Sequence, residues 1–198
     1  MKKILFTSLL SMSVFAYSQF SIPAASPHQK IEQQFSISKI TIDYARPGVK
    51  GRKIFGELVP YGKVWRAGAN SATKITFEQS INFGGKVVPA GTYGLFVIPT
   101  EKDWTIILNK DAQQWGAFDF NEKLNVLQVT VPVQKLNEKQ EWFEISLNPK
   151  DDHSQILTFK WDDVKAEVLL SEGNPETAAK IIDKLKEIKS IQAQASKK

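Results

Sequence analysis

Short runs in which apolar residues alternate with polar ones fill most of this chain, and this pattern constrains the fold more than any other feature of the sequence. Successive side chains of a β-strand point to opposite faces of the sheet, so a period of two indicates a strand with one buried face. The segments predicted to be strands are residues 31–37, 40–44, 73–79, 86–88, 92–98, 104–108, 115–120, 124–133, 142–147, 156–161 and 164–170.

Turn signals separate these segments. Gly84-Gly85 is typical of a tight hairpin turn. Residues 92–98 form a nearly continuous apolar run between two prolines, which indicates a central strand buried on both faces. Turn signals recur about every eight to twelve residues, a spacing typical of sandwiches and barrels. We therefore expect an all-β fold, a single β-sandwich (jelly-roll-like or immunoglobulin-like) of about ten strands over residues 30–171.

The end of the chain, residues 172–198, has a different pattern and is predicted to be an amphipathic helix with a polar tail. Asn174-Pro175-Glu176 combines an N-cap residue, a proline at the first helical position and an early acid. Apolar residues then recur at spacings of three and four. They are Ala178, Ile181, Ile182, Leu185 and Ile188. We expect this helix to pack on the sandwich; the alternative is that it binds a partner or self-associates.

The N-terminus predicts export. Lys2 and Lys3 precede an apolar run, and small residues follow it at the positions that a signal peptidase recognises. Residues 1–18 are therefore predicted to be a signal peptide, followed by an extended leader over residues 19–29. The expected location is periplasmic or secreted, with no membrane span once the signal is removed.

Charge and cysteine content exclude several classes of function. The formal net charge is +5, and removal of the two signal-peptide lysines leaves about +3, too little to indicate a nucleic-acid-binding protein. The chain contains no cysteine, which excludes disulfides, thiolate metal sites and a cysteine nucleophile. No motif for a metal or a cofactor is present, and we predict neither.

Residues 46–70 concentrate the chemistry of the chain. Glu57 is the one acid of this glycine-rich block, which holds six cations, Arg46, Lys50, Arg52, Lys53, Lys63 and Arg66. In one interpretation the arginines hold an irregular loop by donating to backbone carbonyls. In the other, Arg52, Arg66 and Asn70 bind a carboxylate, sulfate or sugar beside an aromatic face. The candidate ligand-binding residues are Arg46, Arg52, Trp65, Arg66, Asn70 and Trp115.

Catalytic signals are sparse. His28 and His153 are the two histidines, and neither lies in a nucleophile, paired-histidine metal or phosphate-loop motif. Carboxylates occur throughout the chain, but sequence gives no distance between any two of them. An enzyme is therefore not favoured.

Three runs give the chain a family resemblance. They are ITIDYARPGVKGRKIFGELVPYGKVWRAGANSAT, GGKVVPAGTYGLFVIP and WTIILNKDAQQWGAF, within residues 26–170. In these runs the chain resembles a family of exported bacterial proteins labelled domain of unknown function 2911. The resemblance implies export and a β-rich domain, and it implies no activity or ligand.

The function favoured by the sequence is non-catalytic binding of a small anion or glycan at residues 46–70. One alternative is a hydrolase that acts on envelope or extracellular carbohydrate or ester. The other is a structural or interaction protein that uses the C-terminal helix.

Overall fold

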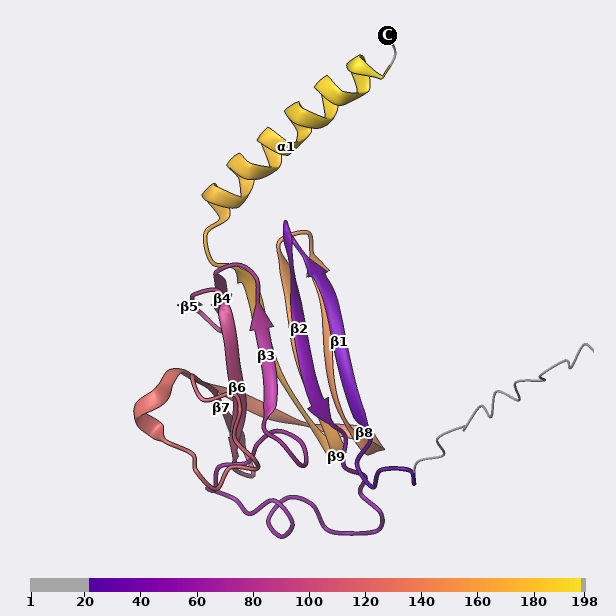
Figure 1. The fold of residues 1–198 in the computed structure, drawn as a ribbon. Coiled ribbons are helices and arrows are strands. Elements are labelled where there is room, and N and C mark those ends of the chain that lie inside the picture. The colour runs from indigo at the N-terminus through magenta and orange to yellow at the C-terminus, as the bar shows by residue number, and fades with distance from the viewer. Residues whose placement is uncertain (1–21, 197–198) are drawn as a thin grey trace, which may run out of the picture.

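The computed structural model describes residues 22–196, which form nine β-strands, one short 3-10 helix (Glu122–Leu124) and one α-helix, α1 (Pro175–Ala195) (Figure 1). The signal peptide predicted for residues 1–18 lies outside the described residues. The strands are β1 (His28–Phe35), β2 (Ser38–Ala45), β3 (Thr73–Phe77), β4 (Ile81–Phe83), β5 (Lys86–Val88), β6 (Gly91–Pro99), β7 (Asp103–Asn109), β8 (Asn125–Asp151) and β9 (Ser154–Glu172).

The nine strands form one antiparallel sheet in the order β1-β2-β3-β6-β7-β8-β9-β4-β5. The sheet folds over its own core, because β2 and β8 are not neighbours in this order and yet Tyr44 meets the ring of Phe143 at 5.8 Å. Trp104 of β7 likewise contacts Phe159 of β9, with centroids 6.3 Å apart. The all-β class with one C-terminal helix is thus confirmed. The folded sheet has two layers, and the long strands β8 and β9 connect them.

Eleven segments were predicted and nine strands form, because two pairs of segments merge, residues 115–120 form no strand, and β4 was not predicted. Residues 124–133 and 142–147 belong to one strand, β8, and residues 156–161 and 164–170 belong to β9. Some polar residues resemble turns in the sequence, but register shifts in the β8–β9 ladder accommodate them within continuous strands. The strand predicted at residues 115–120 is wrong, since Trp115 forms only an isolated bridge with Ser71.

The core confirms the alternation seen in the sequence. Ile40, Ile42 and Tyr44 of β2 are buried while the residues between them are partly exposed. Strand β6 is buried on both faces, because Leu95 belongs to the main core and Phe96 to a second cluster on the other side. The central position predicted for this strand is therefore correct.

Helix α1 begins as predicted. The side chain of Asn174 accepts a hydrogen bond from Thr177 N at 3.0 Å, and Pro175 occupies the first turn. The helix does not lie on the sandwich, however, but projects beyond one end of the sheet (Figure 1). Ala178 is its one buried residue among those described. The chain leaves β9 at the end of the sheet without turning back, so only the N-terminal half of the helix lies near the strands and their turns. Within residues 22–196, no helix combines the length and the apolarity that crossing a membrane requires.

Candidate functional site

The loop between β2 and β3 contains the cationic block, and its arginines add side-chain hydrogen bonds to the backbone hydrogen bonds that hold it. Arg46 Nε donates to the carbonyl of Phe143 at 2.9 Å. Arg52 donates to the carbonyls of Val49 and Gly48 at 3.1 and 2.6 Å. Several guanidinium donors of these two residues therefore satisfy backbone acceptors of an irregular segment, as expected for a scaffold role.

Trp65 is part of the core. Its ring stacks on Trp161 with centroids 5.6 Å apart, and its Nε1 donates to the carbonyl of Gly68 at 3.0 Å. Trp65 is 7% exposed. Since the ring is enclosed by other aromatic residues, it offers no open face on which a sugar can stack.

Arg66 is the exception among the arginines of the loop. Its Nε is buried without a hydrogen-bond partner, and no hydrogen bond or ion pair of its guanidinium is found within residues 22–196. Burial lowers the pKa of Arg66 from its ordinary value, but a guanidinium remains charged at neutral pH. A half-buried cation without a partner is costly, and a bound anion would offset that cost.

A hollow of about 280 Å³ beside Arg66 brings four of the six candidate residues together. Arg52, Trp65, Arg66 and Asn70 line it, and no acidic residue is among its lining residues from the described part of the chain. Two candidates lie elsewhere. Arg46 pairs with Glu144 at 3.8 Å outside the hollow, and Trp115 is 63% exposed beside Ser71.

Further residues that line the hollow carry hydrogen-bond donors without a partner in the described chain. Trp161 also lines it, and the buried Nε1 of this residue has no partner within the described chain. The backbone N–H groups of Gly68, Ala69 and Asn70 donate no hydrogen bond to another described residue. Sequence reasoning could not join Trp161 to this loop, because the contact depends on how β9 crosses the core. The result is a cationic hollow rich in donors.

Tight backbone contacts fix the segment that carries these donors. Ala67 and Asn70 adopt left-handed φ values of 48° and 61°, a conformation that is unfavourable for alanine and tolerated by asparagine. Thr73 Oγ1 donates to the carbonyl of Ala67 at 2.7 Å and holds this turn against β3. Backbone held in an unfavourable conformation is concentrated at functional sites in proteins.

A second hollow, of about 320 Å³, adjoins the first at Ala69 and Asn70. It contains His28, whose Nε2 lies 2.6 Å from a carboxylate oxygen of Asp43. Ser71 also lines this hollow. Within residues 22–196, no group of three or more histidines, cysteines or acids is arranged to hold a metal ion.

A family model described as "Protein of unknown function (DUF2911)" matches residues 26–170. The chain belongs to the DUF2911 family. Neither a curated protein nor a solved structure matches this DUF2911 chain. The matched span contains both hollows, whereas α1 follows it in the sequence. The family description names no activity, so any function must be argued from the geometry.

Proposed function

We propose that this protein binds a small anion in the hollow beside Arg66. The observation that carries the proposal is Arg66, which lines a hollow without an acid among its described lining residues and whose buried Nε has no partner within residues 22–196. An anion in that place would accept charge-assisted hydrogen bonds from Arg66, the stronger class of hydrogen bond in proteins.

The size and lining of the hollow favour a compact ligand group. A volume of about 280 Å³ is slightly below the usual range for sites that bind drug-sized molecules. The planar guanidinium fork matches a carboxylate, sulfate or phosphate. A neutral glycan is less favoured, since Trp65 is stacked inside the core; an acidic sugar would bind through its carboxylate.

Calorimetric titration of the chain from Gln19 onward tests the proposal. The probes are sulfate, phosphate and glucuronate, with glucose as the neutral control and ionic strength held constant with sodium chloride. Arg66→Met removes the charge and keeps the apolar stem. Lys63→Met is the matched control, because Lys63 is an exposed cation of the same loop outside the hollow.

We expect one of the three anions to bind the wild-type chain and Arg66→Met to weaken that binding about tenfold or more, equivalent to about 1.4 kcal/mol. Lys63→Met should change the affinity little. If Arg66→Met and Lys63→Met weaken binding equally, the attraction is a general effect of loop charge. Absence of binding by all three anions would reject the proposal.

A second candidate function is hydrolysis of a carbohydrate or an ester, and the His28–Asp43 contact favours it. The Asp43 carboxylate lies 2.6 Å from His28 Nε2 and orients the imidazole, as the third residue of a catalytic triad does. The second hollow adjoins the Arg66 hollow, so an anionic substrate held by Arg66 would extend toward His28. Hydrolysis of p-nitrophenyl acetate that is lost in His28→Ala and kept in His153→Ala would support it, and equal activity in both variants would reject it.

We also infer export, which rests on the signal-peptide pattern of residues 1–18. Mass spectrometry of the protein from its native host tests this inference. Mature protein that starts at Gln19 supports it, and cytoplasmic protein that retains Met1 contradicts it.

A further inference from the structure

Glu172 is a buried acid at the base of α1. It is the last residue of β9 and pairs with Ile81 of β4, and its side chain is only 4% exposed. Its Oε1 atom is buried and accepts no hydrogen bond within residues 22–196. A carboxylate that is removed from water without a partner is costly, and a cationic hydrogen-bond donor beside this oxygen would offset that cost.

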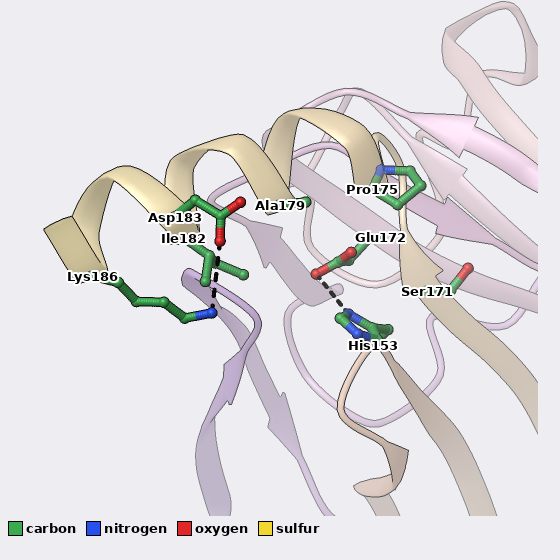
Figure 2. A pocket seen from close by; sticks show the side chains of 8 residues that line it. All are labelled: His153, Ser171, Glu172, Pro175, Ala179, Ile182, Asp183 and Lys186. Carbon is green, nitrogen blue, oxygen red and sulfur yellow. Dashed lines mark ion pairs between the residues drawn. The ribbon is translucent and has the colours of Figure 1, made fainter.

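The basic side chains next to Glu172 in the described chain do not supply such a donor. His153 Nδ1 lies 3.4 Å from Glu172 Oε1 in a geometry that makes no hydrogen bond, and this largely exposed imidazole is charged only when it is protonated. Lys186 Nζ lies 3.7 Å from a carboxylate oxygen of Asp183 instead (Figure 2). The carboxylate of Glu172 is therefore available to a ligand.

A hollow of about 600 Å³ gives a ligand access to this carboxylate. It lies between α1 and the turn that joins β8 to β9, and Glu172 is one of its lining residues (Figure 2). Pro175, Ala179 and Ile182 form an apolar wall on the helix side. Figure 2 shows the Glu172 carboxylate between α1 and His153, facing the space beneath the helix. The volume lies within the usual range for sites that bind small molecules.

We propose that this hollow binds a small primary amine, with its ammonium group on Glu172 and its aliphatic part against α1. An ammonium group has three donors, so it can bind the carboxylate and also the hydroxyl of Ser171, which lines the same hollow. The hydrocarbon part gains from leaving water beside Pro175, Ala179 and Ile182.

Two other kinds of cation fit the lining less well. A quaternary ammonium ion is recognised by aromatic rings, and no Trp, Tyr or Phe is among the lining residues from the described part of the chain. A calcium ion takes six or more oxygen ligands, whereas residues 22–196 contain no group of three or more acids or histidines placed to hold a metal ion. The amine site is also distinct from the Arg66 hollow, because no described residue lines both.

Calorimetric titration of the chain from Gln19 onward with n-pentylamine tests the proposal. At about pH 8 a primary amine is charged and an ordinary histidine is neutral, so His153 does not compete for Glu172. The control ligand is 1-pentanol, which has the same chain and no charge. We expect pentylamine to bind at one site and pentanol to bind about tenfold more weakly or not at all.

Two pairs of variants locate the site. Glu172→Gln keeps the shape of the side chain and should weaken pentylamine binding about tenfold or more, whereas Asp183→Asn, at an acid of the same hollow that is 77% exposed, should change it little. Ala179→Trp fills the hollow from an exposed position of α1 and should block binding with Glu172 intact. Lys180→Trp is its control, because Lys180 does not line the hollow.

The outcomes decide the proposal without reference to the anion site. Absence of pentylamine binding would overturn it, as would equal binding by the wild type and both Glu172→Gln and Ala179→Trp. Equal affinity for pentanol would show an apolar hollow with no role for the charge. Binding of Nα-acetyl-lysine methylamide without binding of pentylamine would overturn the small amine and assign the hollow to lysine side chains of a protein. Arg66→Met should bind pentylamine as the wild type does, so failure of either proposal leaves the other intact.

Discussion

The indole rings of Trp65 and Trp161 stack with their centroids 5.6 Å apart and their planes 19° from parallel. Trp65 belongs to the β2–β3 loop and Trp161 to β9. The pair therefore joins the loop to a strand of the core that is far away in the sequence. Trp104 and Phe143 enclose Trp65 further, at 6.1 and 4.9 Å. Arg66 follows directly in sequence, and its backbone therefore cannot shift without disturbing the core. The backbone of Arg66 is thus fixed before a ligand binds, which lowers the entropic cost of binding.

The arginines of the loop should separate by mutation into stabilising and binding residues. Arg46→Ala removes the bond from Arg46 Nε to the Phe143 carbonyl and leaves that acceptor without this partner. We expect a loss of about 1 to 3 kcal/mol and a melting temperature lower by roughly 2–4 °C per kcal/mol. Arg66→Met removes no hydrogen bond found within residues 22–196 and should leave the melting temperature unchanged or raise it. Calorimetric melting of both variants measures the contrast, and a larger loss for Arg66→Met would contradict it.

The hydroxyl group of Tyr44 should contribute to stability in addition to the packing of its ring against Phe143. The hydroxyl accepts from Ile145 N at 3.0 Å and donates to Gln29 Oε1 at 2.9 Å. Burial raises the pKa of Tyr44, so the hydroxyl stays protonated at neutral pH. Tyr44→Phe leaves a buried N–H unpaired and should cost about 1 to 3 kcal/mol in urea unfolding. Tyr61→Phe is the control at an exposed tyrosine and should change the free energy of unfolding by less than about 0.5 kcal/mol.

Local signals in the sequence predicted much of this architecture. Alternation identified most strands, because one face of each strand is buried and the other is not. The apolar run of residues 92–98 predicted the central position of β6, and Asn174 predicted the start of α1. These features depend on a residue and its near neighbours, which a sequence displays directly.

Features that depend on long-range geometry were missed. Polar residues between 135 and 144 resemble a turn, but register shifts accommodate them inside the continuous strand β8. The sequence predicted that Arg52, Arg66 and Asn70 form one site, because they share a loop. It could not predict that Trp161 of β9 also lines this site. It also could not tell Arg46, which donates to a carbonyl, from Arg66, whose Nε lies buried without a partner within the described chain.

Gly68 should tolerate no side chain. A Cβ at this position would lie 2.9 Å from the carbonyl oxygen of Ala45 and 3.0 Å from Thr73 Oγ1, and the first of these atoms is backbone. Gly68→Ala should therefore destabilise the protein by about 1 to 3 kcal/mol and displace the amides that line the Arg66 hollow.

Gly62→Ala is the control for Gly68→Ala, because Gly62 has a left-handed φ of 71° and nothing within 4 Å of its added Cβ. It should show only the conformational cost, about 1 kcal/mol. Gly68 also has a φ that side chains rarely adopt, 157°, so urea unfolding and anion titration of both variants measure the clash together with any difference in backbone strain. An equal loss of stability in the two variants would show that the clash contributes nothing.

The turn between β8 and β9 should make stability depend on acid pH through Asp151. The carboxylate of Asp151 accepts hydrogen bonds from Ser154 Oγ at 2.7 Å and from His153 N at 2.9 Å. These bonds lower the pKa of Asp151 below the ordinary value for aspartate, about 3.9. Because the pKa is lower in the folded state, this contribution is complete above the pKa of the unfolded chain and disappears as the pH falls through the folded pKa.

Asp151→Ala should accordingly be less stable than the wild type between about pH 5 and 7, and the difference should shrink below about pH 4. Asp152→Ala is the matched control, since Asp152 is the adjacent acid of the same turn and its carboxylate makes no hydrogen bond within the described residues. Chemical unfolding at a series of pH values measures both differences. A gap between Asp151→Ala and the wild type that stays constant from pH 7 to pH 3 would show that the turn depends on the shape of the side chain rather than on its charge.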